Sequence, residues 1–198
     1  MALTFPRLTV SPITKRILNV FGLLAVLIGG YYLYLLATDN FHAVVAGEVY
    51  RSSQPSASAI ARFEGKYGIK TILNLRGENE KHGWYDSEIA QSNALGIKHI
   101  DFRMNSSTEL TPDQAMQLIA IMRDAPKPLL IHCQAGADRT GLASALYLAA
   151  IARKSEKVAE GQLSLRYGHI PYSFSHAFPE RCYSRRSRSP PIVHRRAW

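Results

Sequence analysis

The feature that most constrains the fold of this chain is a short, wholly apolar run that leads directly into a loop of small and polar residues. The run covers residues 128–132 (PLLIH) and the loop residues 132–141 (HCQAGADRTG), and a mostly apolar helix is expected to follow over residues 140–152. An apolar run of this length is typical of a central strand in a parallel sheet, because such a strand is buried on both faces. The strand, loop and helix together predict an α/β fold.

Strands and helices alternate along the rest of the central region. We expect an α/β sandwich in which a central, largely parallel sheet is flanked by helices. The strands are expected at residues 44–50, 69–75, 97–104 and 128–132, and the helices at residues 56–67, 84–95, 111–124, 140–152 and 155–166. The expected N-caps are Ser56 or Ser58, Thr111 and Ser155.

Residues 17–37 form a run of 21 residues without a charged side chain. At about 1.5 Å per residue, a helix of this length crosses a bilayer core of about 30 Å. Tyr31, Tyr32 and Tyr34 lie near its C-terminal end, where amphipathic rings favour the membrane interface. A buried core helix would be shorter, and a cleaved signal peptide would have a shorter apolar region and a small-residue cleavage site directly after it. The run therefore predicts a transmembrane helix.

Charged residues beside this helix indicate its orientation. Arg7, Lys15 and Arg16 precede it, whereas Asp39 and Glu48 follow it. Because positive charge is retained in the cytoplasm, we expect a single-pass protein whose N-terminus is cytoplasmic and whose domain lies outside. The expected organisation is a basic segment at residues 1–16, the transmembrane helix at 17–37, a folded domain at 38–172 and an arginine-rich, disordered tail at 173–198.

The formal net charge of +9 is concentrated at the two ends of the chain. Residues 1–16 carry three basic residues and no acidic one, and residues 179–198 carry six arginines against one glutamate. A nucleic-acid-binding domain carries its basic residues on the folded face, so we expect no nucleic-acid partner. The two cysteines, Cys133 and Cys182, are too few for a disulfide framework, and we expect a free thiol at Cys133.

The loop has the composition of an anion-binding site. Between a strand and a helix, successive backbone N–H groups point inward, and the positive end of the helix dipole adds to them. Gly136 allows the backbone to approach an anion closely, and the planar guanidinium of Arg139 binds two phosphate oxygens. The expected phosphate-binding residues are Gln134, Ala135, Gly136, Ala137, Asp138 and Arg139.

Cys133 is expected at the floor of this cradle. The field that binds an anion also stabilises a thiolate, which is then placed to attack a bound phosphorus in line. Thr140 is expected to hydrogen-bond the sulfur as it leaves, and His132 to orient the loop by binding a backbone carbonyl. A lone cysteine after an apolar strand is usually a core thiol. Here the surrounding residues favour a nucleophile that forms a phosphocysteine, later hydrolysed by water.

The arrangement Cys133-x5-Arg139-Thr140, preceded by His132, resembles the protein tyrosine phosphatase and dual-specificity phosphatase superfamily. The resemblance implies a parallel-centred sheet flanked by helices, no metal, no cofactor, and hydrolysis of phosphomonoesters in proteins or small molecules. It also implies that Cys133 is the nucleophile, Arg139 the phosphate clamp and Thr140 the hydroxyl helper.

Similarity to the small, atypical bacterial and fungal branch of this superfamily extends over residues 41–172. It is carried by residues 47–56 (GEVYRSSQPS), 72–80 (ILNLRGENE) and 162–170 (QLSLRYGHI). A bacterial member with an N-terminal anchor is expected in the inner membrane.

The sequence leaves three acidic candidates for the proton donor to the leaving group, and it leaves open that none of the three is the donor. Asp101 lies 32 positions before the cysteine, which fits the spacing in related enzymes, but it falls within an expected strand. Asp138 lies within the loop, as in some relatives that use this residue in catalysis, although it is also placed to cap the helix or to pair with an arginine such as Arg76. Glu109 is the only acid in the loop over residues 105–110.

Three functions are compatible with this pattern. The first is a phosphatase that acts on phosphotyrosine or phosphoserine/threonine proteins. The second is a phosphoinositide or inositol-phosphate phosphatase, which Ala135 and Ala137 oppose, because relatives selective for such polyanions often carry lysines in the loop. The third is a membrane-tethered pseudophosphatase that only binds phosphate, which the presence of both Cys133 and Arg139 opposes. Arg76 is expected either to extend the positive rim of the site or to be a solvated surface charge.

Overall fold

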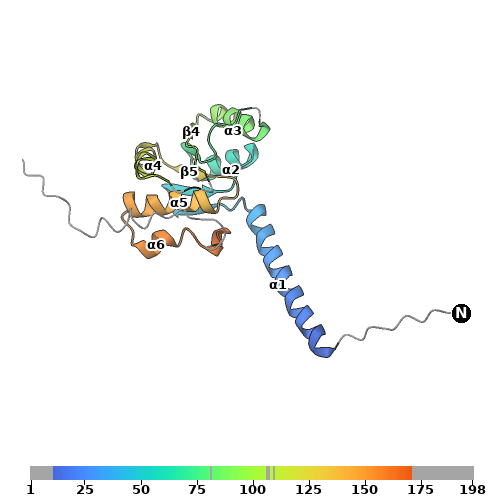
Figure 1. The fold of residues 1–198 in the computed structure, drawn as a ribbon. Coiled ribbons are helices and arrows are strands. Elements are labelled where there is room, and N and C mark those ends of the chain that lie inside the picture. The colour runs from blue at the N-terminus through green and yellow to red at the C-terminus, as the bar shows by residue number, and fades with distance from the viewer. Residues whose placement is uncertain (1–10, 81, 106–107, 109, 171–198) are drawn as a thin grey trace, which may run out of the picture. The chain divides into compact units, whose positions relative to one another are not determined.

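The computed structural model describes residues 11–80, 82–105, 108 and 110–170 (Figure 1). Backbone contacts divide the chain into two compact units, of which the first ends at Thr38 and the second begins at Asp39. The tail expected at residues 173–198 and the acid candidate Glu109 lie outside the described residues. The loop that begins at Cys133 lies within the second unit.

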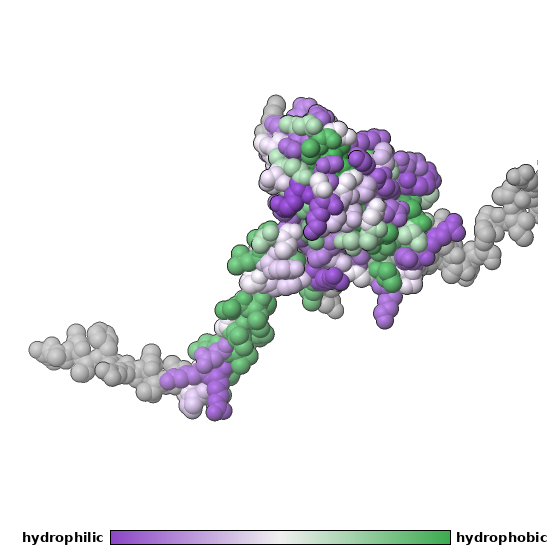
Figure 2. Space-filling model, turned by 180° about the vertical axis from the view of Figure 1, so that it is seen from behind, coloured by the Kyte–Doolittle hydropathy of each residue, from purple (hydrophilic) through white to green (hydrophobic). Residues whose placement is uncertain are grey.

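The first unit contains one long helix, α1 (Pro12–Ala37). Ser11 caps it, because its hydroxyl accepts a hydrogen bond from the backbone N–H of Thr14 at 3.2 Å. Its apolar side chains are exposed along nearly its whole length, and Figure 2 shows them as a green stretch that follows hydrophilic residues. By length and composition α1 is able to cross a membrane, a test that a signal sequence also passes. The helix begins before the expected span, so Lys15 and Arg16 belong to it.

The second unit is built on a five-stranded sheet. Its strands are β1 (His42–Val45), β2 (Val49–Ser52), β3 (Thr71–Asn74), β4 (Lys98–Asp101) and β5 (Leu129–His132). Their order is β1-β2-β5-β3-β4, in which β2, β5, β3 and β4 run parallel and β1 pairs with β2 antiparallel. The sheet is therefore mixed, with a parallel centre. All four residues of β5 are buried, which agrees with its apolar sequence and its central position.

The prediction of a single strand over residues 44–50 is wrong, because a hairpin occupies this stretch. Gly47 has a φ of +78°, in the left-handed region that favours glycine, and the chain reverses there between β1 and β2. The hairpin places Arg51 and Ser52 at the end of β2, beside β5.

Helices cover both faces of the sheet (Figure 1). They are α2 (Ala57–Tyr67), α3 (Gly83–Ala94), α4 (Pro112–Asp124), α5 (Asp138–Leu146) and α6 (Glu156–Glu160). Along β5, Leu129 and Ile131 belong to a core cluster with side chains of α4 and α5, whereas Leu130 belongs to a cluster with side chains of α2. This alternation is the two-residue period of a strand, and the two clusters hold the sheet between its helical layers.

Two expected helix caps are confirmed. The Ser56 hydroxyl accepts a hydrogen bond from the N–H of Ala59 at 3.2 Å at the start of α2. Thr111 forms a capping box with Gln114 at the start of α4, with reciprocal bonds of 3.2 and 3.0 Å. These caps fix where the helices leave the loops at the edge of the sheet.

The helix expected over residues 155–166 is wrong in length. It ends at Glu160, Ser155 makes no side-chain cap bond, and a short 3-10 helix follows at Leu165–Tyr167. The helix expected over residues 140–152 begins at Asp138 and continues beyond α5 as a π-helix. In the irregular stretch after α6 the chain returns to the loop that contains Cys133, because Arg51 binds both Gln162 and Gly136.

Candidate active site

Cys133 lies at the carboxyl edge of the sheet, directly after its central strand. β2, β3 and β5 end level with one another, since Ser52 and Asn74 both pair with His132. In an open α/β sheet this edge is where ligands bind. Cys133 is a free cysteine and only 3% exposed, and α5 begins shortly after it at Asp138. The strand–loop–helix arrangement expected from the sequence is therefore present.

The carbonyl oxygens of three successive loop residues are held by donors from outside the loop. Gln134 O accepts from the N–H of Gln54 at 3.1 Å, Ala135 O from Asn40 Nδ2 at 3.0 Å, and Gly136 O from Arg51 Nη2 at 2.6 Å. In a trans peptide the carbonyl and the following N–H point in opposite directions. The N–H groups of residues 135–137 therefore point away from these donors, and none has a partner within the described part of the chain. This is the geometry of an anion cradle.

Arg51 is the central brace of the loop. It is fully buried and donates through Nη2 to Gly136 and through Nη1 to the backbone and side-chain oxygens of Gln162, both at 2.8 Å. Its guanidinium also stacks on the Tyr167 ring, 3.8 Å from the centroid. Burial lowers the pKa of Arg51 to about 10, against the opposing charges of Tyr167 and Cys133, so the side chain stays charged at neutral pH.

Gly136 occupies a position where a side chain does not fit. Its φ is +72°, and a Cβ there would lie 2.7 Å from both the carbonyl oxygen of Ser52 and the N–H nitrogen of Ser53. The loop therefore packs directly against the end of β2, as close backbone approach at a glycine allows.

Arg139 and Thr140 lie in the first turn of α5. Arg139 is partly exposed, and its Nη1 lies 3.4 Å from the carbonyl oxygen of Met104. Thr140 is fully buried, and its hydroxyl oxygen has no hydrogen-bond partner among the residues that the structure describes. A buried hydroxyl without a protein partner is available to a group that enters the loop.

Asp138 is held by a residue that the sequence did not single out. Its Oδ1 accepts from His169 Nδ1 at 2.7 Å, and His169 is only 5% exposed. The residue lies in the first turn of α5 and does not act as the N-cap, and its hydrogen-bond partner is His169 and not Arg76. Its other oxygen has no partner in the described residues.

Asp101 is the last residue of β4 and is engaged through both carboxylate oxygens. Oδ1 accepts from Asn74 Nδ2 at 2.8 Å, and Oδ2 accepts from the Tyr85 hydroxyl at 2.7 Å. β3 lies between β4 and β5, and Asn74 of β3 pairs with both Asp101 and His132. The backbones of Asp101 and His132 are therefore level and two strand spacings apart, about 10 Å.

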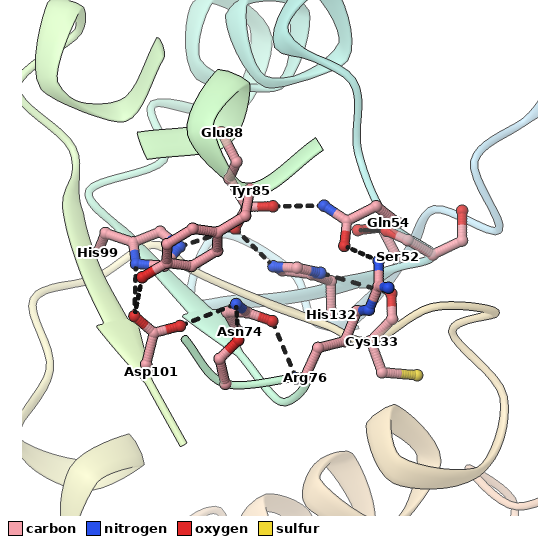
Figure 3. Close-up of polar contacts among 12 residues, drawn as sticks. Ser52, Gln54, Asn74, Arg76, Tyr85, Glu88, His99, Asp101, His132 and Cys133 are labelled. Atoms are coloured by element: carbon pink, nitrogen blue, oxygen red, sulfur yellow. Dashed lines mark hydrogen bonds and ion pairs between the residues drawn. The ribbon is translucent and has the colours of Figure 1, made fainter. Parts of the chain in front are cut away.

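Glu88 on α3 links the loop to this edge of the sheet, as Figure 3 shows. It is buried, and its Oε1 accepts from the Nε2 atoms of both His132 and His99 at 2.8 Å, while Oε2 accepts from the Gln54 side chain. His132 was expected to orient the loop through a backbone carbonyl. Its Nδ1 lies 3.4 Å from Cys133 O, so the carboxylate of Glu88 is its shorter contact.

These histidines control the ionisation of Glu88. Burial by itself raises the pKa of Glu88, but the charge and hydrogen bond of His132, together with those of His99, outweigh it and lower the pKa to about 2. An ionised Glu88 only accepts hydrogen bonds, so the Nε2 atoms of both histidines carry hydrogen. The contact with Glu88 therefore fixes the orientation of the His132 ring, whose Nε2 donates to the carboxylate.

Glu88 is expected to make the stability of the folded chain depend on pH. The pKa of Glu88 is about 2 in the folded chain, against a reference value of 4.5 for the unfolded chain. Its contribution to the free energy of unfolding is therefore full above pH 4.5 and is lost as the pH falls toward 2. The free energy of unfolding should drop by roughly 3 kcal/mol over this window, in addition to the losses from other carboxylates. Urea unfolding of Glu88→Gln, followed by circular dichroism at several pH values, should lack this part of the drop. An identical pH profile in both proteins would contradict the assignment.

Comparison with known proteins identifies the family. Residues 28–164 match the tyrosine phosphatase family. The chain is similar to TpbA of P. aeruginosa, with 19% identity, 67% of this chain and 78% of that chain covered, and a TM-score of 0.52. It is similar to the core catalytic domain of the PP-IP phosphatase SIW14 of S. cerevisiae in complex with citrate, with 22% identity, coverage of 71% and 80%, and a TM-score of 0.56.

A further similar structure is that of PTPMT1, with 13% identity, coverage of 66% of this chain and 87% of that chain, and a TM-score of 0.53. At these identities the likeness shows a shared fold, the mixed sheet with helices on both faces. The family match shows more than a shared fold, because it spans most of the chain and includes the loop at Cys133. This chain belongs to the tyrosine phosphatase family.

Proposed function

We propose that this chain, a cysteine-dependent phosphatase by its family, hydrolyses phosphomonoesters through a phosphocysteine formed at Cys133. The observation that carries the proposal is the outward anchoring of three successive loop carbonyls, which turns the N–H groups of residues 135–137 away from those donors and leaves them without partners in the described structure. These donors and the first turn of α5 favour negative charge beside a cysteine, which suits both a bound phosphate and a thiolate.

In the proposed reaction the Cys133 thiolate attacks the phosphorus and the ester oxygen leaves with a proton from an acid. The loop N–H groups and Arg139 hold the non-bridging oxygens as their charge redistributes. Water then attacks the phosphocysteine, the S–P bond breaks, and inorganic phosphate leaves with the thiolate restored. Thr140 supports this second step, because its buried hydroxyl is free of other partners in the described structure and is able to donate to the departing sulfur.

We propose Asp138 as the proton donor in place of Asp101 or Glu109. Asp138 belongs to the loop and has one carboxylate oxygen uncommitted in the described structure, whereas both oxygens of Asp101 accept hydrogen bonds. Asp101 also stands two strands from β5, and a proton donor has to reach the leaving oxygen directly or through one water.

Asp138→Asn is expected to lower kcat/KM on phenyl phosphate by roughly 10²-fold or more, because a poor leaving group needs the proton. The loss on p-nitrophenyl phosphate, whose leaving group is good, should be much smaller. The matched variants Asp101→Asn and Glu109→Gln should keep the leaving-group dependence of the wild type. A steeper leaving-group dependence in Asp101→Asn, with a wild-type dependence in Asp138→Asn, would assign the proton to Asp101 instead.

The substrate class proposed first is a phosphorylated protein or a small phosphomonoester. A cysteine-to-serine variant of TpbA has been solved in complex with phosphotyrosine, and SIW14 is described as a PP-IP phosphatase. A phosphotyrosine ligand and a PP-IP substrate are thus both named for proteins of this fold. Dual specificity toward phosphotyrosine and phosphoserine/threonine remains a prediction.

We also propose that α1 anchors the enzyme in a membrane, with a cytoplasmic N-terminus and the domain outside. Length, apolar composition and the basic residues at its start support this arrangement. An outside location would expose the Cys133 thiolate to oxidising conditions, which its burial counters by limiting access. A mature chain that begins after Ala37 would identify a signal peptide in place of an anchor.

A further inference from the structure

Arg76 leaves the sheet beside the loop that contains Cys133. It lies two residues after the end of β3, which is paired in parallel with β5, and the N–H of Leu75 donates to His132 O at 2.9 Å. The backbone N–H of Arg76 in turn donates to the Asn74 side chain at 2.9 Å. Arg76 is therefore fixed at the carboxyl edge of the sheet, one strand away from the cysteine.

The guanidinium of Arg76 is held in one place by two contacts. It stacks on the Trp84 ring, 3.6 Å from the centroid, and its Nη1 donates to Gln54 Oε1 at 3.0 Å. Gln54 also binds the loop, since its backbone N–H donates to Gln134 O. Figure 3 shows the Arg76 side chain ending at Gln54, on the side of the network where Cys133 lies. One residue thus couples the position of Arg76 to that of the loop.

The charge of Arg76 is not neutralised by an ion pair. Among the described residues, no carboxylate lies within ion-pair distance of Arg76 or Arg139. Partial burial and the positive charge of Arg139 lower the pKa of Arg76, and the negative charges of Cys133 and Glu88 offset this only in part. Two neighbouring arginines with unused N–H donors favour a ligand that carries more negative charge than one phosphate group.

We propose that Arg76 forms a second anion subsite beside the phosphate loop, and that the substrate carries a second phosphoryl group next to the one that is hydrolysed. This inference rests on the proposed function. Arg139 and the loop N–H groups serve the reacting phosphoryl group, whereas Arg76 presents its planar fork to the neighbouring one. A pair of phosphomonoesters on adjacent carbons and a pyrophosphate both present two neighbouring phosphoryl groups, although in the pyrophosphate the bond that breaks is a phosphoanhydride.

The test compares inhibitors with one and two phosphoryl groups, using the full chain in detergent micelles and p-nitrophenyl phosphate as the substrate. Methylenediphosphonate, which resists hydrolysis, should inhibit the wild type about tenfold or more better than methylphosphonate, since a charge-assisted contact is gained. Arg76→Met, whose side chain still packs on Trp84, should remove most of this preference. Arg123→Met, at an exposed arginine on α4, is the matched control and should keep it.

Adding 2,3-bisphosphoglycerate separates the two sources of the second phosphoryl group. If Arg76→Met weakens inhibition by this compound more than inhibition by methylenediphosphonate, the second phosphoryl group is a phosphate on an adjacent carbon. The opposite order indicates a pyrophosphate. Equal inhibition of the wild type by all three compounds overturns the subsite, whether or not the variant folds. The subsite is also overturned if Arg76→Met weakens inhibition by all three compounds to the same extent. Absence of hydrolysis by the wild type would be a failure of the proposed function and not of the subsite, which binding measurements would still test.

Discussion

Replacing Cys133 by serine is expected to lower kcat on p-nitrophenyl phosphate by on the order of 10⁴-fold or more. The change only replaces the sulfur with an oxygen, so the fold and the loop should persist. A serine hydroxyl has no neighbouring base in the described structure to activate it, because His132 next to it is turned toward Glu88. The measurement needs the full chain in detergent micelles with a reducing agent, because an oxidised thiolate would also be inactive.

Phosphate binding distinguishes this expectation from a pseudophosphatase. Calorimetric titration with phosphotyrosine should show that Cys133→Ser still binds, since the loop N–H groups and Arg139 remain in place. Wild-type protein that binds phosphotyrosine but releases no phosphate would make the chain a binding protein. Wild-type turnover that survives in Cys133→Ser would exclude the phosphocysteine route.

The strand, loop and helix around Cys133 were predictable because the signals that specify them are local. Four apolar residues in succession indicate a buried strand, and glycines and an arginine at fixed spacing indicate the loop. The caps at Ser56 and Thr111 are local in the same sense, since each contact spans three residues. Such features need no knowledge of the rest of the fold.

The residues that hold the loop in shape were missed because their contacts depend on the register of the sheet. Arg51 and Gly136 are 85 positions apart in sequence, Asn40 and Ala135 are 95 apart, and Glu88 and His132 are 44 apart. The single strand expected at residues 44–50 also hid Arg51, because the hairpin at Gly47 is what brings it beside β5. An arginine within the strand pattern VYRS was the one available signal.

Arg51→Met is the second change for which a large effect is expected. The variant leaves the buried oxygens of Gly136 and Gln162 without their donor, and each unsatisfied buried acceptor costs about 1–3 kcal/mol. The free energy of unfolding should fall by about 3–5 kcal/mol, because three buried acceptor atoms lose their donor together. Without Arg51, the peptide between Gly136 and Ala137 is free to rotate. The N–H of Ala137 then no longer faces the anion site.

The positioning role of Arg51 is separable from its role in stability. At a temperature where Arg51→Met is still folded by circular dichroism, kcat on p-nitrophenyl phosphate should fall by roughly 10²-fold, because oriented donors stabilise the charge that develops in the transition state. Alkylation of Cys133 by iodoacetamide at pH 6 should slow, since the loop then favours the thiolate less.

Arg51→Lys decides between charge and geometry. It keeps the charge, but a single ammonium group does not reproduce the fork that binds Gly136 and Gln162 together, so we expect only partial rescue of kcat. Full rescue would mean that positive charge beneath the loop is sufficient and that the outward anchoring of the carbonyls is not what creates the site. A variant that loses stability but keeps wild-type kcat and wild-type alkylation would likewise remove Arg51 from the positioning of the loop and leave it a structural residue.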